Sequence, residues 1–261
     1  MAPGSTEIRE RKRYVIDTSL QGPVAVLTLN RPERRNALGS EGVRALDAAL
    51  RAVEHNPEVR AVVLAGAPPA FCAGSDLKEL GGKSIPDMCA HEAETAMVAR
   101  KIGFLGKPVI AAVEGYALGG GFILAVSCDL VVTASDTRWH LPEVPNGWTP
   151  PWGLGALIAR VGPVKARRLA WGAEPIEGTE AHRLGVADDL AEPGAALARA
   201  LGLAEALARL PPEAVRSIKS FFERFASADG ERLDQLASRL FAQDCESTAA
   251  KATLSKFTVK A

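Results

Sequence analysis

The segment from Lys107 to Glu143 constrains the fold more than any other part of the chain. It reads KPVIAAVEGYALGGGFILAVSCDLVVTASDTRWHLPE. The apolar run at 109–113 predicts a buried strand, glycines follow at 119–121, and the apolar stretch 122–127 predicts a helix before a further strand at 130–133. Glycine lets a backbone approach a ligand closely, and a helix that begins there points free N–H groups at it. The segment therefore predicts a site for a phosphate or an oxyanion.

The rest of the chain alternates between strand and helix patterns. Strands are predicted at 14–18, 24–29 and 59–65, and a helix at 40–55 with Ser40 as its N-cap. This alternation predicts an α/β fold with parallel βαβ-like units. The polar stretch 77–106 predicts mostly helix, broken at Gly81-Gly82 and at Pro86, and three more helices are predicted at 194–209, 213–228 and 230–249.

Composition excludes several classes of protein. The 261 residues carry 31 basic and 31 acidic side chains, so there is no general attraction to nucleic acid or to an anionic membrane. The 4 cysteines have no metal-ligand spacing and suit reduced thiols in a cytoplasm. The N-terminal MAPGSTEIRERKRY has no apolar run, so it predicts no secretory signal, and no apolar stretch is long enough to span a membrane. We therefore expect a cytoplasmic protein with no metal.

Three blocks of sequence carry a resemblance to a known family. They read LNRPERRNAL at 29–38, AFCAGSDL at 70–77, and the glycine segment described above. In this order and at these distances, they resemble the enoyl-CoA hydratase/isomerase family, the crotonase superfamily, over about residues 14–225. The resemblance implies a crotonase-like ββα spiral core with an acyl-CoA site at 13–195. It also implies a C-terminal helical trimerisation region at 196–261, and hence a homotrimer or a dimer of trimers.

The resemblance also implies an oxyanion hole that holds a thioester carbonyl as it gains enolate character. Its two donors fall on the backbone N–H groups of Ser75 and Gly120. Coenzyme A would arrive as part of the substrate, with no permanently bound cofactor. The residues implied to contact it are Arg31, Arg34, Arg35, Ala37, Ala73, Ser75, Asp76, Leu77 and Gly120. Two other interpretations stay open. Asp76 is also placed to cap a helix. The three arginines are also typical of a run of solvent-exposed charges before a helix.

The acid–base groups depart from the hydratase pattern. Hydratases of the family use two glutamates, and these fall at Ile123 and Glu143 in this chain. A lone carboxylate can move a proton from C2 to C4, and the apolar loop from Trp148 to Trp152 would desolvate it. These features favour double-bond isomerisation in fatty acid metabolism, with Glu143 as the only base. Water addition would need another polar side chain near Ile123.

Other reactions and residues remain as alternatives. A hydratase/dehydratase (a lyase), a decarboxylase with the same oxyanion hole, and a CoA-binding homologue without activity all stay open. The family's dehalogenases need an aspartate where this chain has Pro151, which argues against that reaction. His140 is a weaker candidate for the pocket, and Glu114 is expected to be structural. His91 and Glu92 fall on a helix that varies in the superfamily, so neither is assigned a role.

Overall fold

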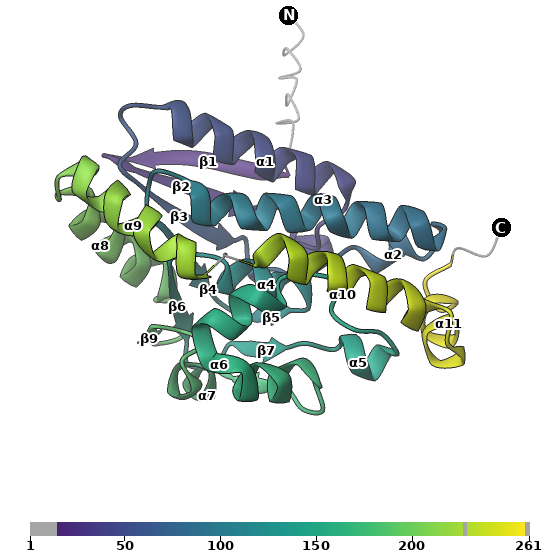
Figure 1. The fold of residues 1–261 in the computed structure, drawn as a ribbon. Helices are drawn as coiled ribbons and strands as arrows, with labels where there is room; N and C mark the ends of the chain where they lie inside the picture. Colours follow the sequence, from purple (N-terminus) through teal and green to yellow (C-terminus); the bar gives the residue numbers. More distant parts are fainter. Residues whose placement is uncertain (1–14, 227–228, 259–261) are drawn as a thin grey trace, which may run out of the picture.

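The computed structural model describes residues 15–226 and 229–258 (Figure 1). Tyr14, the first residue of the first predicted strand, lies outside these residues. So does the N-terminal segment from which we predict that there is no secretory signal. No helix in the described ranges is long and apolar enough to cross a membrane.

Two β-sheets form the framework. The larger sheet has the order β1-β2-β3-β4-β6-β9 and the smaller one the order β5-β7-β8. Strand β1 pairs antiparallel with β2, and every later pair in the larger sheet is parallel, which confirms the predicted α/β class. The strands are β1 (Ile16–Gln21), β2 (Val24–Leu29), β3 (Ala61–Gly66), β4 (Val109–Val113), β5 (Tyr116–Leu118), β6 (Leu130–Ala134), β7 (Arg138–His140), β8 (Ile176–Glu177) and β9 (Asp189–Ala191).

The helices cover both faces of the larger sheet. One core lies between the sheet and α1, α3, α4 and α6, and a second lies between its other face and α8. The C-terminal helix α10 runs across the molecule between α3 and α6 (Figure 1). The helices are η1 (Pro32–Arg34), α1 (Ser40–His55), α2 (Leu77–Leu80), α3 (Ile85–Phe104), α4 (Gly120–Val126), α5 (Glu143–Asn146), α6 (Leu154–Ala170), α7 (Gly178–Leu184), α8 (Ala196–Ala208), α9 (Pro212–Ala226), α10 (Gly230–Cys245) and α11 (Thr248–Leu254).

Three local predictions are wrong, each for a physical reason. Ser40 is not an N-cap but the first residue of α1, because the Glu79 carboxylate accepts hydrogen bonds from its backbone N–H, at 3.0 Å, and from its hydroxyl. Pro86 does not break a helix, because it lies in the first turn of α3, where a missing N–H costs nothing. The single helix predicted at 230–249 is two helices, because the Ser247 side chain caps α11 by accepting from the Ala250 N–H at 3.2 Å.

The exposed apolar side chains of α9 predict self-association. Ile218 and Phe222 are each 61% exposed and line a groove of about 830 Å³ between α9 and the core. Leu236 and Leu240 of α10 are also exposed, whereas Phe225 belongs to the residues whose side chains are not described. Apolar side chains gathered in this way mark an interaction surface. We expect sedimentation to show three or six chain masses, and a stable monomer at micromolar concentration would contradict a trimer or a dimer of trimers.

Candidate active site

Two neighbouring parallel strands bring the predicted catalytic groups together. Strand β5 pairs with β7 in the register Leu118 with His140. The chain leaves β5 into Gly119 and the start of α4, and it leaves β7 into the turn that carries Glu143. Because the carboxyl ends of parallel strands lie at the same edge of a sheet, the Gly120 N–H and the Glu143 carboxylate come to one place.

The loop that carries Ser75 is held on both sides. Leu38 N donates to Gly74 O at 2.8 Å and Asp76 N donates to Leu38 O at 3.0 Å, which joins this loop to the one before α1. On its other side, Leu118 N donates to Cys72 O at 3.0 Å. The loops containing Ser75 and Gly120 are therefore fixed relative to each other by main-chain hydrogen bonds.

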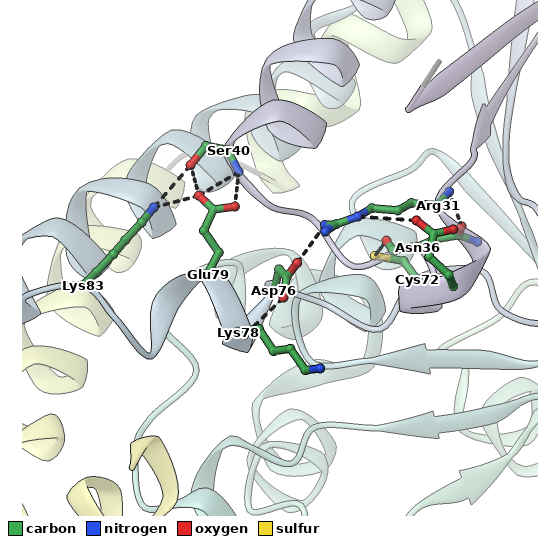
Figure 2. Close-up of polar contacts among 9 residues, drawn as sticks. Arg31, Asn36, Ser40, Cys72, Asp76, Lys78, Glu79 and Lys83 are labelled. Carbon is green, nitrogen blue, oxygen red and sulfur yellow. Dashed lines mark hydrogen bonds and ion pairs between the residues drawn. The ribbon is translucent and has the colours of Figure 1, made fainter. Parts of the chain in front are cut away.

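Asn36 fixes the loop before α1, and the sequence analysis gave it no separate role (Figure 2). It is buried in a left-handed backbone conformation with φ of 57°. Its side-chain amide donates to Ala70 O at 2.6 Å and its oxygen accepts from Arg31 N at 2.8 Å. Cys72 packs beside it and donates to Asn36 O at 3.2 Å. Burial raises the pKa of Cys72 to about 12, so this thiol is neutral and structural.

Ser75 and Gly120 lie side by side, as an oxyanion hole requires. A Cβ on Gly120 would lie 3.8 Å from Ser75 N, and a Cβ on Gly74 would lie 2.9 Å from Gly120 N. Gly74 has φ of +83°, so the approach of the two loops depends on a glycine here. Gly120 is the first residue of α4, so its N–H has no acceptor within that helix. Both N–H groups can therefore point at one oxygen atom of a ligand.

Glu143 is buried against these donors. Its carboxylate Oε1 would lie 2.8 Å from a Cβ on Gly119. Its other oxygen, Oε2, is buried without a hydrogen-bond partner among the described residues. Burial raises the pKa of Glu143 to about 8; a hydrogen bond from its own backbone opposes the rise, and the nearby charge of Glu92 adds to it. At neutral pH, Glu143 is therefore a protonated carboxylic acid that faces a small cavity.

The cavity is small and its walls are mostly apolar. Its volume is about 70 Å³. Ile123 stands at the position of the first glutamate of the hydratases, so its side chain offers no polar atom there. It is fully buried, and its Cγ2 occupies the space where a Cβ on Gly153 would lie. The side chains that line the cavity include Leu77, Leu80, Met88, Pro150, Pro151, Trp148, Trp152, Phe241 and Leu254.

Helix α10 holds the loop that forms one wall of this cavity. Asp244 accepts a hydrogen bond from Thr149 N at 2.8 Å, and Asp234 accepts one from Gly153 N at 2.7 Å. Asp234 also forms an ion pair with Arg100 of α3. The two aspartates thus fix the two ends of the loop that carries Trp152.

Four of the residues expected to contact coenzyme A line the cavity, namely Ala73, Ser75, Leu77 and Gly120. Two others, Arg31 and Asp76, already have partners within the chain (Figure 2). Asp76 caps α2 by accepting from Lys78 N at 3.1 Å, and it pairs with Arg31 at 2.7 Å. The guanidinium of Arg35 lies 4.9 Å from the centre of the Tyr116 ring. The remaining members of the set are Arg34 in η1 and Ala37 before α1.

The weaker candidates are structural or lie off the site. Nε2 of His140 is 2.8 Å from Gly172 O, which ties β7 to the loop after α6. Glu114 accepts from Ala196 N at 2.8 Å and so caps α8, as expected of a structural residue. His91 is buried in α3, and neither of its ring nitrogens has a hydrogen-bond partner among the described residues.

Glu92 is the residue that the sequence analysis left without a role and that the structure brings into the cavity. It comes from α3 and is 4% exposed. Its Oε2 accepts a hydrogen bond from Trp152 Nε1 at 2.7 Å. No local signal in the sequence predicts this placement, because Glu92 falls on a helix that varies in the superfamily.

Comparison with known proteins assigns the family. The family described as "Enoyl-CoA hydratase/isomerase" matches residues 19–261. The chain belongs to the enoyl-CoA hydratase/isomerase family. A short-chain-enoyl-CoA hydratase of Clostridium acetobutylicum is 35% identical over 230 residues, which cover 87% of this chain and 88% of that protein. A 2,3-dehydroadipyl-CoA hydratase of Escherichia coli is 36% identical over 202 residues, which cover 77% of this chain and 78% of that protein.

A solved member of the enoyl-CoA hydratase/isomerase family confirms the fold. The crystal structure of a putative enoyl-CoA hydratase from Mycobacterium avium paratuberculosis has a TM-score of 0.84 and 30% sequence identity, with 93% of this chain and 95% of that chain covered. The predicted crotonase-like fold with its C-terminal helical region is therefore confirmed. The names of the relatives do not support the expected preference for isomerisation, because they point to hydratases.

Proposed function

We propose that this protein is an enoyl-CoA hydratase that adds water across the C2=C3 bond of a short 2-enoyl-CoA. The observation that carries the proposal is the pair of backbone donors at Ser75 and Gly120 beside the buried carboxyl of Glu143. The N–H pair would hold the thioester oxygen as it becomes an enolate, and Glu143 would exchange a proton with C2. Fixed donors of this kind stabilise developing negative charge strongly in a water-poor site.

The charge state of Glu143 suits this role. With its pKa raised to about 8, the carboxyl holds a proton at neutral pH and can deliver it to C2 of the enolate. In the reverse direction, the ionised form would remove the same proton. The apolar walls around the carboxyl keep bulk water from competing with the substrate.

The cavity supports a short acyl group. A volume of about 70 Å³ accommodates only a few carbon atoms, and the rings of Trp148 and Phe241 limit its size. The rest of the substrate would leave the cavity past Ser75 toward the loop before α1. In this proposal, the phosphates of coenzyme A lie near Arg31, Arg34 and Arg35, because guanidinium groups suit phosphate oxygens.

Double-bond isomerisation is the second candidate for this site. It is favoured by one observation, the buried aliphatic Ile123 at the position where hydratases of the family have a glutamate. A single base at Glu143 would then move a proton between C2 and C4. The hydratase names of the relatives support the first candidate over this one.

One pair of assays separates the two reactions. We expect the protein to hydrate crotonyl-CoA, followed as the loss of the absorbance of the conjugated thioester, faster than it converts 3-butenoyl-CoA to crotonyl-CoA. Both substrates have four-carbon acyl groups, so the size of the cavity affects both equally. Isomerisation without measurable hydration would overturn the hydratase proposal and favour the lone-base reaction. Turnover of neither substrate by a folded protein that still binds CoA would favour an inactive homologue.

A further inference from the structure

A second carboxylate enters the cavity from an element that does not carry the family's glutamates. Glu92 lies on α3, 51 residues before Glu143 in the sequence, and lines the same cavity as Glu143, Ser75 and Gly120. Its side chain is buried and forms no ion pair with another residue in the described part of the chain. Burying an acid without an ion pair is costly, so its presence in this cavity calls for a functional explanation.

A hydrogen bond from Trp152 holds Glu92 close to Gly120 in the cavity. Trp152 Nε1 donates to Glu92 Oε2 at 2.7 Å, and the Cζ2 atom of the same indole would lie 3.0 Å from a Cβ on Gly120. Glu92 is therefore separated from Gly120 by the edge of one indole ring.

The two carboxyl groups have different surroundings. Burial raises the pKa of Glu92, while hydrogen bonds from Ser75 and Trp152 and the charge of His91 act against this rise. Glu143 has a buried oxygen without a donor. The two carboxyl groups share one cavity, and a pair that holds a single proton contains one acid and one base.

We infer that Glu92 is the second acid–base group for water addition and takes the place of the carboxylate that this chain lacks at Ile123. The inference rests on the proposed hydratase function. Hydration needs another polar side chain near Ile123, and Glu92 provides one. Glu92 and Ile123 line the same cavity, and both lie against the segment Trp152-Gly153.

The reaction then balances with these two groups alone. Glu92 accepts a proton from water as the water oxygen bonds to C3. The π electrons of the C2=C3 bond move into the thioester enolate, which the N–H groups of Ser75 and Gly120 stabilise. Glu143 gives its proton to C2 as the enolate collapses. The net change is the addition of one water, and the proton on Glu92 returns to Glu143 through the next water that enters.

The test compares two reactions of the variant Glu92→Gln. Glutamine keeps an oxygen that accepts from Trp152, so the loop should keep its position, but it cannot accept a proton from water. We expect hydration of crotonyl-CoA to fall by at least about 100-fold. Exchange of the C2 protons of butyryl-CoA with D₂O needs only the oxyanion hole and Glu143, so we expect it to stay within about threefold of the native rate. Its pH profile should move to lower pH, because the charge that raises the pKa of Glu143 is gone.

The matched control is Glu94→Gln, a carboxylate on the exposed side of the same helix, and both rates should be unchanged. If Glu92→Gln hydrates crotonyl-CoA at a near-native rate, Glu92 is not the second group, and the proposed function stands without it. If hydration and exchange fall together, Glu92 only maintains the shape of the cavity, and the inference is overturned. If the native protein exchanges C2 protons but hydrates nothing, the proposed function and the role of Glu92 fail together.

Discussion

Replacing Glu143 by glutamine is expected to lower kcat for crotonyl-CoA hydration by about 10³-fold, because the amide cannot deliver a proton to C2. The exchange of the C2 protons of butyryl-CoA should be lost to the same degree. The variant should fold normally, since Glu143 is a neutral acid at pH 7 and glutamine has the same shape. Steady-state kinetics at pH 7 give the size of the effect, and circular dichroism verifies the fold.

The pH dependence of the native protein provides the control for this assignment. A pKa raised to about 8 means that Glu143 keeps its proton through neutral pH and loses it as the pH rises through 8. Hydration needs the protonated form, so kcat/KM should fall above that pH, and because the overall reaction takes up no proton, kcat/KM for dehydration of 3-hydroxybutyryl-CoA should fall in parallel. A flat profile from pH 7 to 9.5 in both directions, or a Glu143→Gln variant with near-native turnover, would remove Glu143 from the mechanism.

Gly120→Pro should reduce kcat for hydration by about 100-fold to 1,000-fold, because proline has no N–H to donate to the enolate oxygen. Proline is tolerated at the first position of a helix, and Gly120 is the first residue of α4, so the backbone should accept it. The effect should be on kcat more than on KM, since the hydrogen bond strengthens as charge develops. Stopped assays at saturating crotonyl-CoA measure it.

The variant Gly120→Ala separates the lost donor from the added bulk. Alanine keeps the N–H, but its Cβ would lie 3.0 Å from Cζ2 of Trp152, so the ring must move by a few tenths of an ångström. We expect a much smaller loss of kcat than in the proline variant. Equal losses in the two variants would mean that displacement of Trp152, and not the absent donor, explains the effect.

Local sequence patterns predicted the elements and residues whose partners are close along the chain. The strand at 109–113 has the predicted bounds, because a short, continuous apolar run flanked by turn residues is typical of a buried strand. The capping role of Asp76 followed from its place before a short helix, and its acceptor bond from Lys78 N confirms it. The structural role of Glu114 beside the Gly115 turn is confirmed in the same way by its hydrogen bonds to α8.

The features that sequence alone did not predict depend on contacts between distant segments. Ser40 begins α1 rather than capping it because of a carboxylate 39 residues away, and no local pattern records that partner. Glu92 lies on a helix with polar and apolar residues mixed around its circumference, so the pattern does not say which side faces the cavity. Its partner, Trp152, is 60 residues away. A motif along the chain indicates the proposed oxyanion donors, but it does not indicate a carboxylate that a covering helix brings into the cavity.

The contacts of α10 with the loop at 149–153 divide the protein into two functional layers. The proposed donors for the enolate lie on loops held by the sheets, whereas Phe241 of α10, Leu254 of α11 and the loop fixed by Asp234 and Asp244 line the part of the cavity where we propose that the acyl group binds. Sequence changes in the C-terminal helices can therefore alter which acyl chain is accepted without disturbing the reacting atoms. Substrate range and chemistry can evolve separately in such a chain. Changing residues of the C-terminal helices should therefore allow the same catalytic site to accept longer acyl groups.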